Sequence, residues 1–281
     1  MSRIARDAFD RAAVTYDAHS VLQAEVGRRL LDHLEGLRID PEVVLDLGCA
    51  TGAGLEGLRG EFPRASLLGL DLSTAMLRLA AARRPWWKRL MGRDATPLVC
   101  ADAQRLPVKT ASVQLVFSNL MLQWCEPETV FAEAARVLPA GGLFMFSTFG
   151  PDTLKELRAA FAAVGAGDRI NRFIDMHDLG DALVHAGFAD PVMEMEMVTL
   201  EYSRVEDLVG DLHAVGSHAR RADATALERA RWSAMTQAYD KHRRADALPA
   251  TYEVIYGHAW KVAPRKIADG RQVIDFQGRR P

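Results

Sequence analysis

The stretch that decides the fold is VVLDLGCATGAG, residues 43–54. An apolar, β-branched run opens it, carries an acid at Asp46, and then breaks into a turn of small residues at Gly48, Ala50 and Gly52. This is the pattern of a buried parallel strand that leads through a tight loop into a helix. Small residues let the backbone approach a ligand closely, and glycine also supplies positive φ angles. An acid at the strand end suits a cationic or amine-bearing ligand better than a phosphate.

Two interpretations of this loop compete. The dinucleotide fingerprint G-x-G-x-x-G/A, aligned on Gly48, meets Ala50 where its second glycine should admit the pyrophosphate. The loop instead resembles motif I of the S-adenosylmethionine (SAM) methyltransferases, in which the acid lies near the amino-acid part of the cofactor. We therefore favour SAM over NAD, and a plain strand-to-helix turn is the third possibility.

Further apolar segments end in polar residues in the same way. Asp71 ends one of them, about 20 residues beyond the glycine loop, where an acid can accept both ribose hydroxyls. Asp102 follows the next, where SAM enzymes usually carry an acid that meets the adenine amino group, and Ser118 and Asn119 follow another. Because open α/β sheets bind ligands at the carboxyl edge, these residues in register predict a cofactor site, although Asp is more commonly a helix N-cap. The predicted strands are 65–72, 97–101, 113–118 and 141–149.

Composition narrows the class of protein. The chain has 281 residues, of which 49% are apolar, and this is ample for a globular core. A net charge of −2 argues against nucleic acid as a partner. The three cysteines show no C-x-x-C spacing and favour buried, reduced thiols. The charged N-terminal residues do not resemble a signal peptide, and no run approaches the ~20 apolar residues that span a bilayer. We expect a cytoplasmic protein with no stable membrane association and no metal.

The rest of the chain divides into three parts. Residues 1–40 are expected to form a helical lid, 41–262 a SAM-binding domain, and 263–281 a basic tail. Within the domain, an alternating strand at 191–202 and a last strand at 252–262 enclose a helical insert at about 204–245. The expected helices lie at 152–164, 176–186, 205–215 and 224–243. The basic segment RRPWWKRLMGR, 83–93, fits either a docking loop or a solvated helix end.

Several stretches beyond motif I carry a more specific resemblance. The chain is similar to the malonyl-[acyl-carrier protein] O-methyltransferases of biotin synthesis, which are class I SAM methyltransferases. The similarity covers nearly the whole chain, with Ala50 replacing the usual glycine. It implies a Rossmann-like α/β sheet, mostly parallel with an antiparallel last strand, together with N-terminal helices and a helical insert. The stretches that carry it are FDRAAVTYDAHSVLQ (9–23), SNLMLQWC (118–125), FSTFGPDTLKELR (146–158), NRF (171–173) and LPATYEVIYGHAW (248–260).

The resemblance implies SAM as cofactor and methyl transfer to the free carboxylate of malonyl-acyl-carrier protein or malonyl-CoA. A carboxylate has an ordinary pKa of about 4, so it is already a nucleophile at pH 7 and needs no catalytic base. The predicted cofactor-binding residues are Tyr16, Asp46, Gly48, Ala50, Gly52, Asp71, Leu72, Met76, Asp102, Ala103, Gln104, Ser118 and Asn119.

Substrate residues are predicted separately. Arg172 is the first candidate for gripping the carboxylate, because its guanidinium can form a bidentate pair, although a surface arginine is an equal alternative. Gln123 and Trp124 are expected to line the acceptor pocket. His19 and His177 are expected to be structural. A basic rim for an acidic carrier protein would come from Lys155, Arg158, Arg169, Arg220, Arg221, Arg243 and Arg244.

Three rival functions remain open at this stage. One is a related SAM-dependent arginine hydroxylase of respiratory-complex assembly, which shares the Rossmann core. The second is a small-molecule carboxyl methyltransferase, and the third is a non-catalytic SAM-binding protein.

Overall fold

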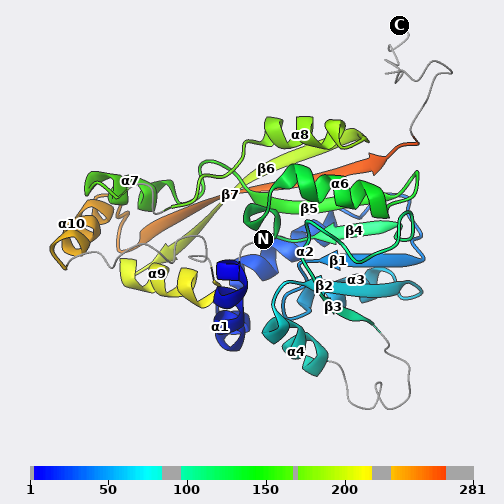
Figure 1. Cartoon of the computed structure of the whole chain (residues 1–281). Helices are drawn as coiled ribbons and strands as arrows, with labels where there is room; N and C mark the ends of the chain where they lie inside the picture. Colours follow the sequence, from blue (N-terminus) through cyan, green and yellow to red (C-terminus); the bar gives the residue numbers. More distant parts are fainter. Residues whose placement is uncertain (1–2, 84–95, 167–169, 217–228, 264–281) are drawn as a thin grey trace, which may run out of the picture.

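One seven-stranded sheet organises the protein in the computed structural model, which describes residues 3–83, 96–166, 170–216 and 229–263 (Figure 1). The strand order is β3-β2-β1-β4-β5-β7-β6. All neighbouring pairs are parallel except those of β7, which runs antiparallel to both β5 and β6. The predicted α/β class with an antiparallel last strand is therefore confirmed. The strands are β1 (Val43–Leu47), β2 (Ser66–Asp71), β3 (Leu98–Cys100), β4 (Leu115–Ser118), β5 (Leu143–Phe149), β6 (Phe188–Tyr202) and β7 (Leu248–Lys261).

Helices cover both faces of this sheet, and two more helices precede it in the chain (Figure 1). The last two helices lie between β6 and β7 in the chain, where the helical insert is expected. The helices are α1 (Arg3–His19), α2 (Val21–Asp32), α3 (Ala53–Glu61), α4 (Thr74–Arg83), α6 (Pro127–Val137), α7 (Lys155–Ala163), α8 (Met176–His185), α9 (Val205–Ala214) and α10 (Arg229–Asp240), with a short 3-10 helix η1 (Leu122–Trp124).

The core forms two layers because strand residues alternate between the two faces. Val44 and Leu115 pack with apolar residues of α2, α3 and α7 on one face. Leu45 and Val116 pack with α6 and α8 on the other. Strands that are buried on both faces read as continuous apolar runs, which is why the sequence pattern around residue 44 was informative.

Many element bounds differ from the predicted ones by a few residues, and three of the differences have a clear physical meaning. The predicted N-terminal helical segment is broken at Ser20, so that α1 and α2 are separate helices. Strand β6 begins before Pro191, and a bulge between Ala189 and Val192 accommodates the proline, which cannot donate a hydrogen bond. Strand β7 begins at Leu248, four residues before its predicted start, and pairs with β6 through Pro249.

The division of the chain into a lid, a cofactor domain and a basic tail stays a prediction. Most of the Trp-Trp segment (83–93) and nearly all of the tail (263–281) lie outside the described residues, as do Arg169, Arg220 and Arg221. Within the part of the chain that is described, none of the helices combines the length and apolar character required to cross a bilayer.

Candidate active site

The glycine loop lies between the carboxyl ends of β1 and β2. The backbone N–H groups of Gly48 and Cys49 donate to the carbonyl of Leu70, at N···O distances of 2.8 and 3.0 Å. Gly48 has a φ of +84°, and a Cβ there would lie 2.5 Å from Cγ of Met121. Gly52 has a φ of +87° and is the N-cap residue of α3. Glycine at these two positions is thus required by the backbone conformation and, at Gly48, by close packing.

Ala50 lies in the middle of this loop and also has a positive φ, +43°. The left-handed region costs an L-residue roughly 1–2 kcal/mol, because Cβ approaches the following carbonyl oxygen. Ala50 is therefore accommodated with strain, and not simply by its small size.

Asp71 closes the loop from the neighbouring strand. Its Oδ2 accepts a hydrogen bond from the backbone N–H of Ala50 at 2.9 Å, and its Oδ1 accepts one from the N–H of Ser73 at 2.8 Å. Burial raises the pKa of Asp71 above its ordinary value, the nearby Asp10 carboxylate adds to the rise, and the backbone N–H bonds oppose it. Each carboxylate oxygen can accept more than one hydrogen bond, so Asp71 can still accept from ligand hydroxyls.

Asp46 lies behind the loop. Only 2% of its surface is exposed, and its Oδ2 has no hydrogen-bond partner among the described residues. Burial, reinforced by the charge of Asp71, raises the pKa of Asp46 to about 7. A buried carboxylate with an incomplete set of partners is costly, and a cationic group would relieve that cost.

Helix α1 covers the carboxyl edge and is fastened to it by polar contacts. Asp10 accepts hydrogen bonds from the Ser73 hydroxyl and from the backbone N–H of Ala75, while Asp17 accepts one from the Thr51 hydroxyl at 2.6 Å. Burial, together with the carboxylates of Asp71 and Asp17, raises the pKa of Tyr16 above its ordinary range, so the phenol remains a hydrogen-bond donor.

A small cavity of about 70 Å³ lies under α1. It brings together most of the predicted cofactor residues, and its lining contains a carboxylate but no Lys or Arg among the described residues. A carboxylate in such a lining suits the ribose hydroxyls of a nucleoside or an amine. The predicted residues that line it are Tyr16, Gly48, Ala50, Asp71, Leu72, Met76, Ala103 and Asn119.

The other predicted cofactor residues lie just outside this cavity. Asp46 is buried behind the loop, and Gly52 lies in the loop as the N-cap residue of α3. Ser118 is buried and donates to the carbonyl of Leu47 at 2.9 Å. The Asp102 carboxylate accepts from the backbone N–H of Gln104 at 3.0 Å. The Gln104 side chain in turn accepts from the N–H of Glu126. The cofactor contacts of all these residues stay predictions.

A larger cavity of about 610 Å³ adjoins the small one. Its wall is mostly apolar and is built by α1, α2, α7, β6, α9 and β7. Polar groups lie among these apolar residues, including the pair His19 Nδ1···Asp211 Oδ1 at 2.7 Å. His19 therefore ties α1 to α9 and also lines the larger cavity, and the structural role expected of it stays a prediction. Five residues line both cavities, and we call them the throat: Gln23, Gln123, Trp124, Phe149 and Val215.

The predicted substrate residues do not all lie at the cavities. Gln123 and Trp124 both lie at the throat, and the Trp124 ring meets Phe9 of α1 edge-on at 5.1 Å between ring centroids. Arg172 is exposed and lines neither cavity, whereas its neighbours Asn171 and Phe173 line the larger one. Its role as a carboxylate clamp stays a prediction without a supporting contact.

The sequence reasoning missed several residues that line the cavities. Phe9 and Gln23 lie in the N-terminal stretch 9–23 that carried the resemblance, but no pattern singled them out. Leu120 lines the small cavity at a positive φ of +48°, a conformation that nothing in a leucine predicts. The residues of α9 and β6 in the larger cavity could be found only from the tertiary arrangement.

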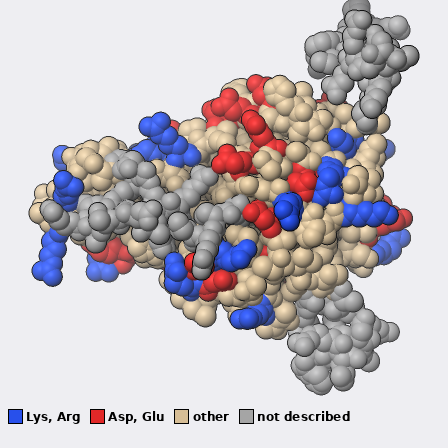
Figure 2. All heavy atoms as spheres, in the orientation of Figure 1, with Lys and Arg blue, Asp and Glu red and all other residues tan. Residues whose placement is uncertain are grey.

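The proposed basic rim is only partly free to meet a partner. Arg158 donates to the carbonyls of Pro151 and Thr153, and Arg243 pairs with Asp240. Arg244 is exposed. Figure 2 shows basic and acidic side chains interspersed over the visible face, so no field of one sign dominates that side.

Comparisons with known proteins agree with this geometry. A model of a methyltransferase domain matches residues 45–146, from β1 into β5. The chain is 48% identical to the malonyl-[acyl-carrier protein] O-methyltransferase of Gallionella capsiferriformans, over 96% of this chain and 94% of that protein. The chain belongs to the malonyl-[acyl-carrier protein] O-methyltransferase family. Another member, from Laribacter hongkongensis, is 47% identical over 98% of this chain and 96% of its own length.

Solved structures support the fold at much lower identity. The YcgJ protein of Bacillus subtilis superposes with a TM-score of 0.57 at 14% identity, over 84% of this chain and 99% of that one. Phosphoethanolamine N-methyltransferase 2 of Haemonchus contortus gives 0.58 at 19% identity, over 92% of this chain and 60% of that one. These similarities establish the methyltransferase fold of the chain and carry no information about its substrate.

Proposed function

We propose that this protein transfers a methyl group from SAM to the free carboxylate of a malonyl thioester carried by acyl-carrier protein. The observation that carries the proposal is the pair of adjoining cavities with a common throat. The lining of one cavity contains a carboxylate and, among the residues that the structure describes, no Lys or Arg, which suits a nucleoside bearing an amine. The other cavity has room for a thioester. Membership of the family supports the choice of acceptor.

When bound, SAM supplies an electrophilic methyl group on a sulfonium. In this proposal Asp71 would accept the ribose hydroxyls, and Tyr16 and Asp46 would hold the amino-acid part. One oxygen of the acceptor carboxylate forms a bond to the methyl carbon as the sulfur–methyl bond breaks, and the electron pair stays on sulfur. No proton moves, and none of the five throat residues is a titratable acid or base, which suits a nucleophile that is ionised at pH 7. Positioning would then supply most of the rate enhancement.

The size of the larger cavity supports a tethered acceptor. At about 610 Å³ it exceeds what a malonyl group needs, and it leaves room for the extended arm that joins a thioester to its carrier. Carrier protein in preference to coenzyme A, and a cytoplasmic location, stay predictions.

A series of thioesters tests the proposal. With labelled SAM, malonyl thioester should accept the methyl group, whereas acetyl and butyryl thioesters lack the nucleophile and should not. Longer dicarboxyl chains should react more slowly, because misplacing the oxygen by about 1 Å can cost on the order of 100-fold. Equal labelling of acetyl and malonyl thioesters would contradict carboxylate methylation. Hydroxylation of a protein arginine without methyl transfer, or labelling of a free acid alone, would favour one of the rival activities.

A further inference from the structure

The throat between the two cavities contains two side-chain amides, which differ in their hydrogen bonding. The amide of Gln123 is already engaged, because its Nε2 donates to the carbonyl of Leu120 at 2.6 Å and its Oε1 accepts from the Thr148 hydroxyl at 3.4 Å. The Oε1 of Gln23 is buried and has no hydrogen-bond partner among the described residues. Buried polar atoms are nearly always paired in native proteins, so an unpaired one at a cavity wall points to a ligand.

The backbone of Gln23 is held firmly although its side chain is not. The Gln23 carbonyl accepts a hydrogen bond from Nδ2 of Asn119 at 2.9 Å, and Asn119 in turn accepts from the Ser147 hydroxyl at 2.7 Å. One turn further along α2, Gly27 allows close contact, since a Cβ there would lie 2.8 Å from the same Nδ2. These contacts fix Gln23 beside the ends of β4 and β5.

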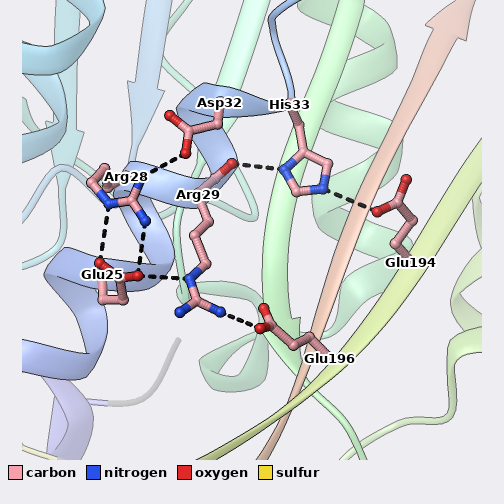
Figure 3. Close-up of polar contacts among 7 residues, drawn as sticks. All are labelled: Glu25, Arg28, Arg29, Asp32, His33, Glu194 and Glu196. Atoms are coloured by element: carbon pink, nitrogen blue, oxygen red, sulfur yellow. Dashed lines mark hydrogen bonds and ion pairs between the residues drawn. The ribbon is translucent and has the colours of Figure 1, made fainter.

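The other end of α2 is anchored to the edge of the sheet. Arg29 lies between Glu25 of its own helix and Glu196 of β6, and bonds to both (Figure 3). His33 Nε2 contacts Glu194 of the same strand at 3.2 Å (Figure 3). Helix α2 is therefore braced at both ends, and the amide of Gln23 is presented to the throat by a fixed support, as a binding group requires.

We propose that the side-chain amide of Gln23 donates a hydrogen bond to the acceptor carboxylate at the throat, and so determines that the acceptor ends in a free carboxylate. This assignment rests on the proposed function. An amide can turn by half a rotation about its last side-chain bond, so it can present Nε2 to an anion from the same position. Once the amide has turned, Nε2 faces the carboxylate, and Oε1 leaves the buried position at which it has no partner among the described residues.

A neutral donor suits this reaction better than a cation at the same place. The acceptor enters as an anion and leaves as a neutral ester, and the positive charge that balances the anion comes from the sulfonium. A guanidinium at the throat would hold the negative charge on the oxygen that must attack. None of the five throat residues is a Lys or Arg. Arg11 of α1 lines the larger cavity but not the throat, and Arg172 is exposed and lines neither cavity.

The test uses two variants of nearly the same shape, Gln23→Met and Gln23→Glu, with Gln237→Met as a control on the exposed side of α10. The first readout is binding of malonyl-CoA and acetyl-CoA to the protein saturated with S-adenosylhomocysteine. The second is kcat/KM for malonyl thioester with SAM, and the third is the melting temperature of the protein without ligand.

The wild type should bind malonyl-CoA more tightly than acetyl-CoA, and Gln23→Met should lose that preference. Because Gln23→Met loses a hydrogen bond to a charged group, its kcat/KM for the malonyl thioester should fall roughly ten- to hundredfold. The kcat/KM of Gln23→Glu should fall further, because the new carboxylate repels the carboxylate of the acceptor. The affinity for S-adenosylhomocysteine should stay within about twofold. The melting temperature of Gln23→Met should not fall, since the variant removes an unpaired buried oxygen.

Three results would overturn the assignment. Unchanged discrimination between malonyl-CoA and acetyl-CoA in both variants would show that Gln23 does not meet the carboxylate. An equal loss of S-adenosylhomocysteine affinity would place the amide against the cofactor. A fall in melting temperature that accounts for the lost activity would make the residue structural. If Gln23→Met does not fold, Gln23→Glu tests the contact with the carboxylate independently. A folded wild type that binds SAM but methylates no malonyl thioester would instead refute the proposed function, and this assignment with it.

Discussion

The buried acid Asp46 makes stability depend on pH in a direction opposite to that of most carboxylates. Its pKa in the folded protein is about 7, against an ordinary value of 3.8. The folded protein therefore holds more protons than the unfolded chain between about pH 4 and pH 7, and stability falls as the pH rises through that window. A difference of about 3 pKa units corresponds to roughly 4 kcal/mol over the whole window. Between pH 5 and pH 8 the loss of stability due to Asp46 is roughly 2–3 kcal/mol.

Asp46→Asn removes this ionisation while keeping the shape of the side chain. As the pH is raised from about 5 to 8, the free energy of unfolding of the variant, measured with urea, should rise relative to that of the wild type by roughly 2–3 kcal/mol. Asp190→Asn, at an exposed position, serves as the control and should follow the wild type across the same range. Parallel curves for Asp46→Asn and the wild type would refute the reasoning, because they would mean that Asp46 ionises normally when folded.

Three further predictions concern the loop and its supports. Asp71→Ala should weaken SAM binding by roughly 2–3 kcal/mol, since it removes a charged acceptor for the ribose hydroxyls, and calorimetry that finds the affinity of a folded variant unchanged would exclude that contact. Ala50→Gly should raise the free energy of unfolding by about 0.5–1 kcal/mol, because relief of the left-handed strain exceeds the added chain entropy, and a measured loss in urea unfolding would contradict the strain. Gly27→Ala should lower the free energy of unfolding by about 1–3 kcal/mol, because its Cβ would clash with Asn119. The control Gly60→Ala should be neutral or stabilising, since its Cβ would meet no atom within 4 Å. Similar unfolding curves for the two variants would contradict the close packing of α2.

The sequence predicted the parallel half of the sheet well because its strands are buried on both faces and read as apolar runs. Asp71 and Ser118 end β2 and β4, as the sequence indicated, and Asp102 follows the end of β3 by two residues. Their roles in binding stay predictions. The start of β7 was missed because Pro249 lies within it, and a proline in an apolar run argues against a strand.

The substrate side was less predictable, for a physical reason. The larger cavity is walled by segments that are far apart in the sequence, so no local pattern marks it. Arg172 was chosen for the chemistry of its guanidinium, but whether a side chain faces a cavity depends on tertiary packing. Gln23 was passed over because a glutamine on a helix is ordinary in sequence, and only the state of its amide in the fold distinguishes it.

The central claim is that the acceptor is the malonyl carboxylate. Mass spectrometry of malonyl-acyl-carrier protein after incubation with SAM and this protein tests it most directly. The account predicts that the malonyl group gains the mass of one CH₂ group, with one S-adenosylhomocysteine released for each methyl ester, while acetyl-acyl-carrier protein is unchanged. A methyl group on the carrier polypeptide, or no methylation by a folded protein that binds SAM, would contradict it.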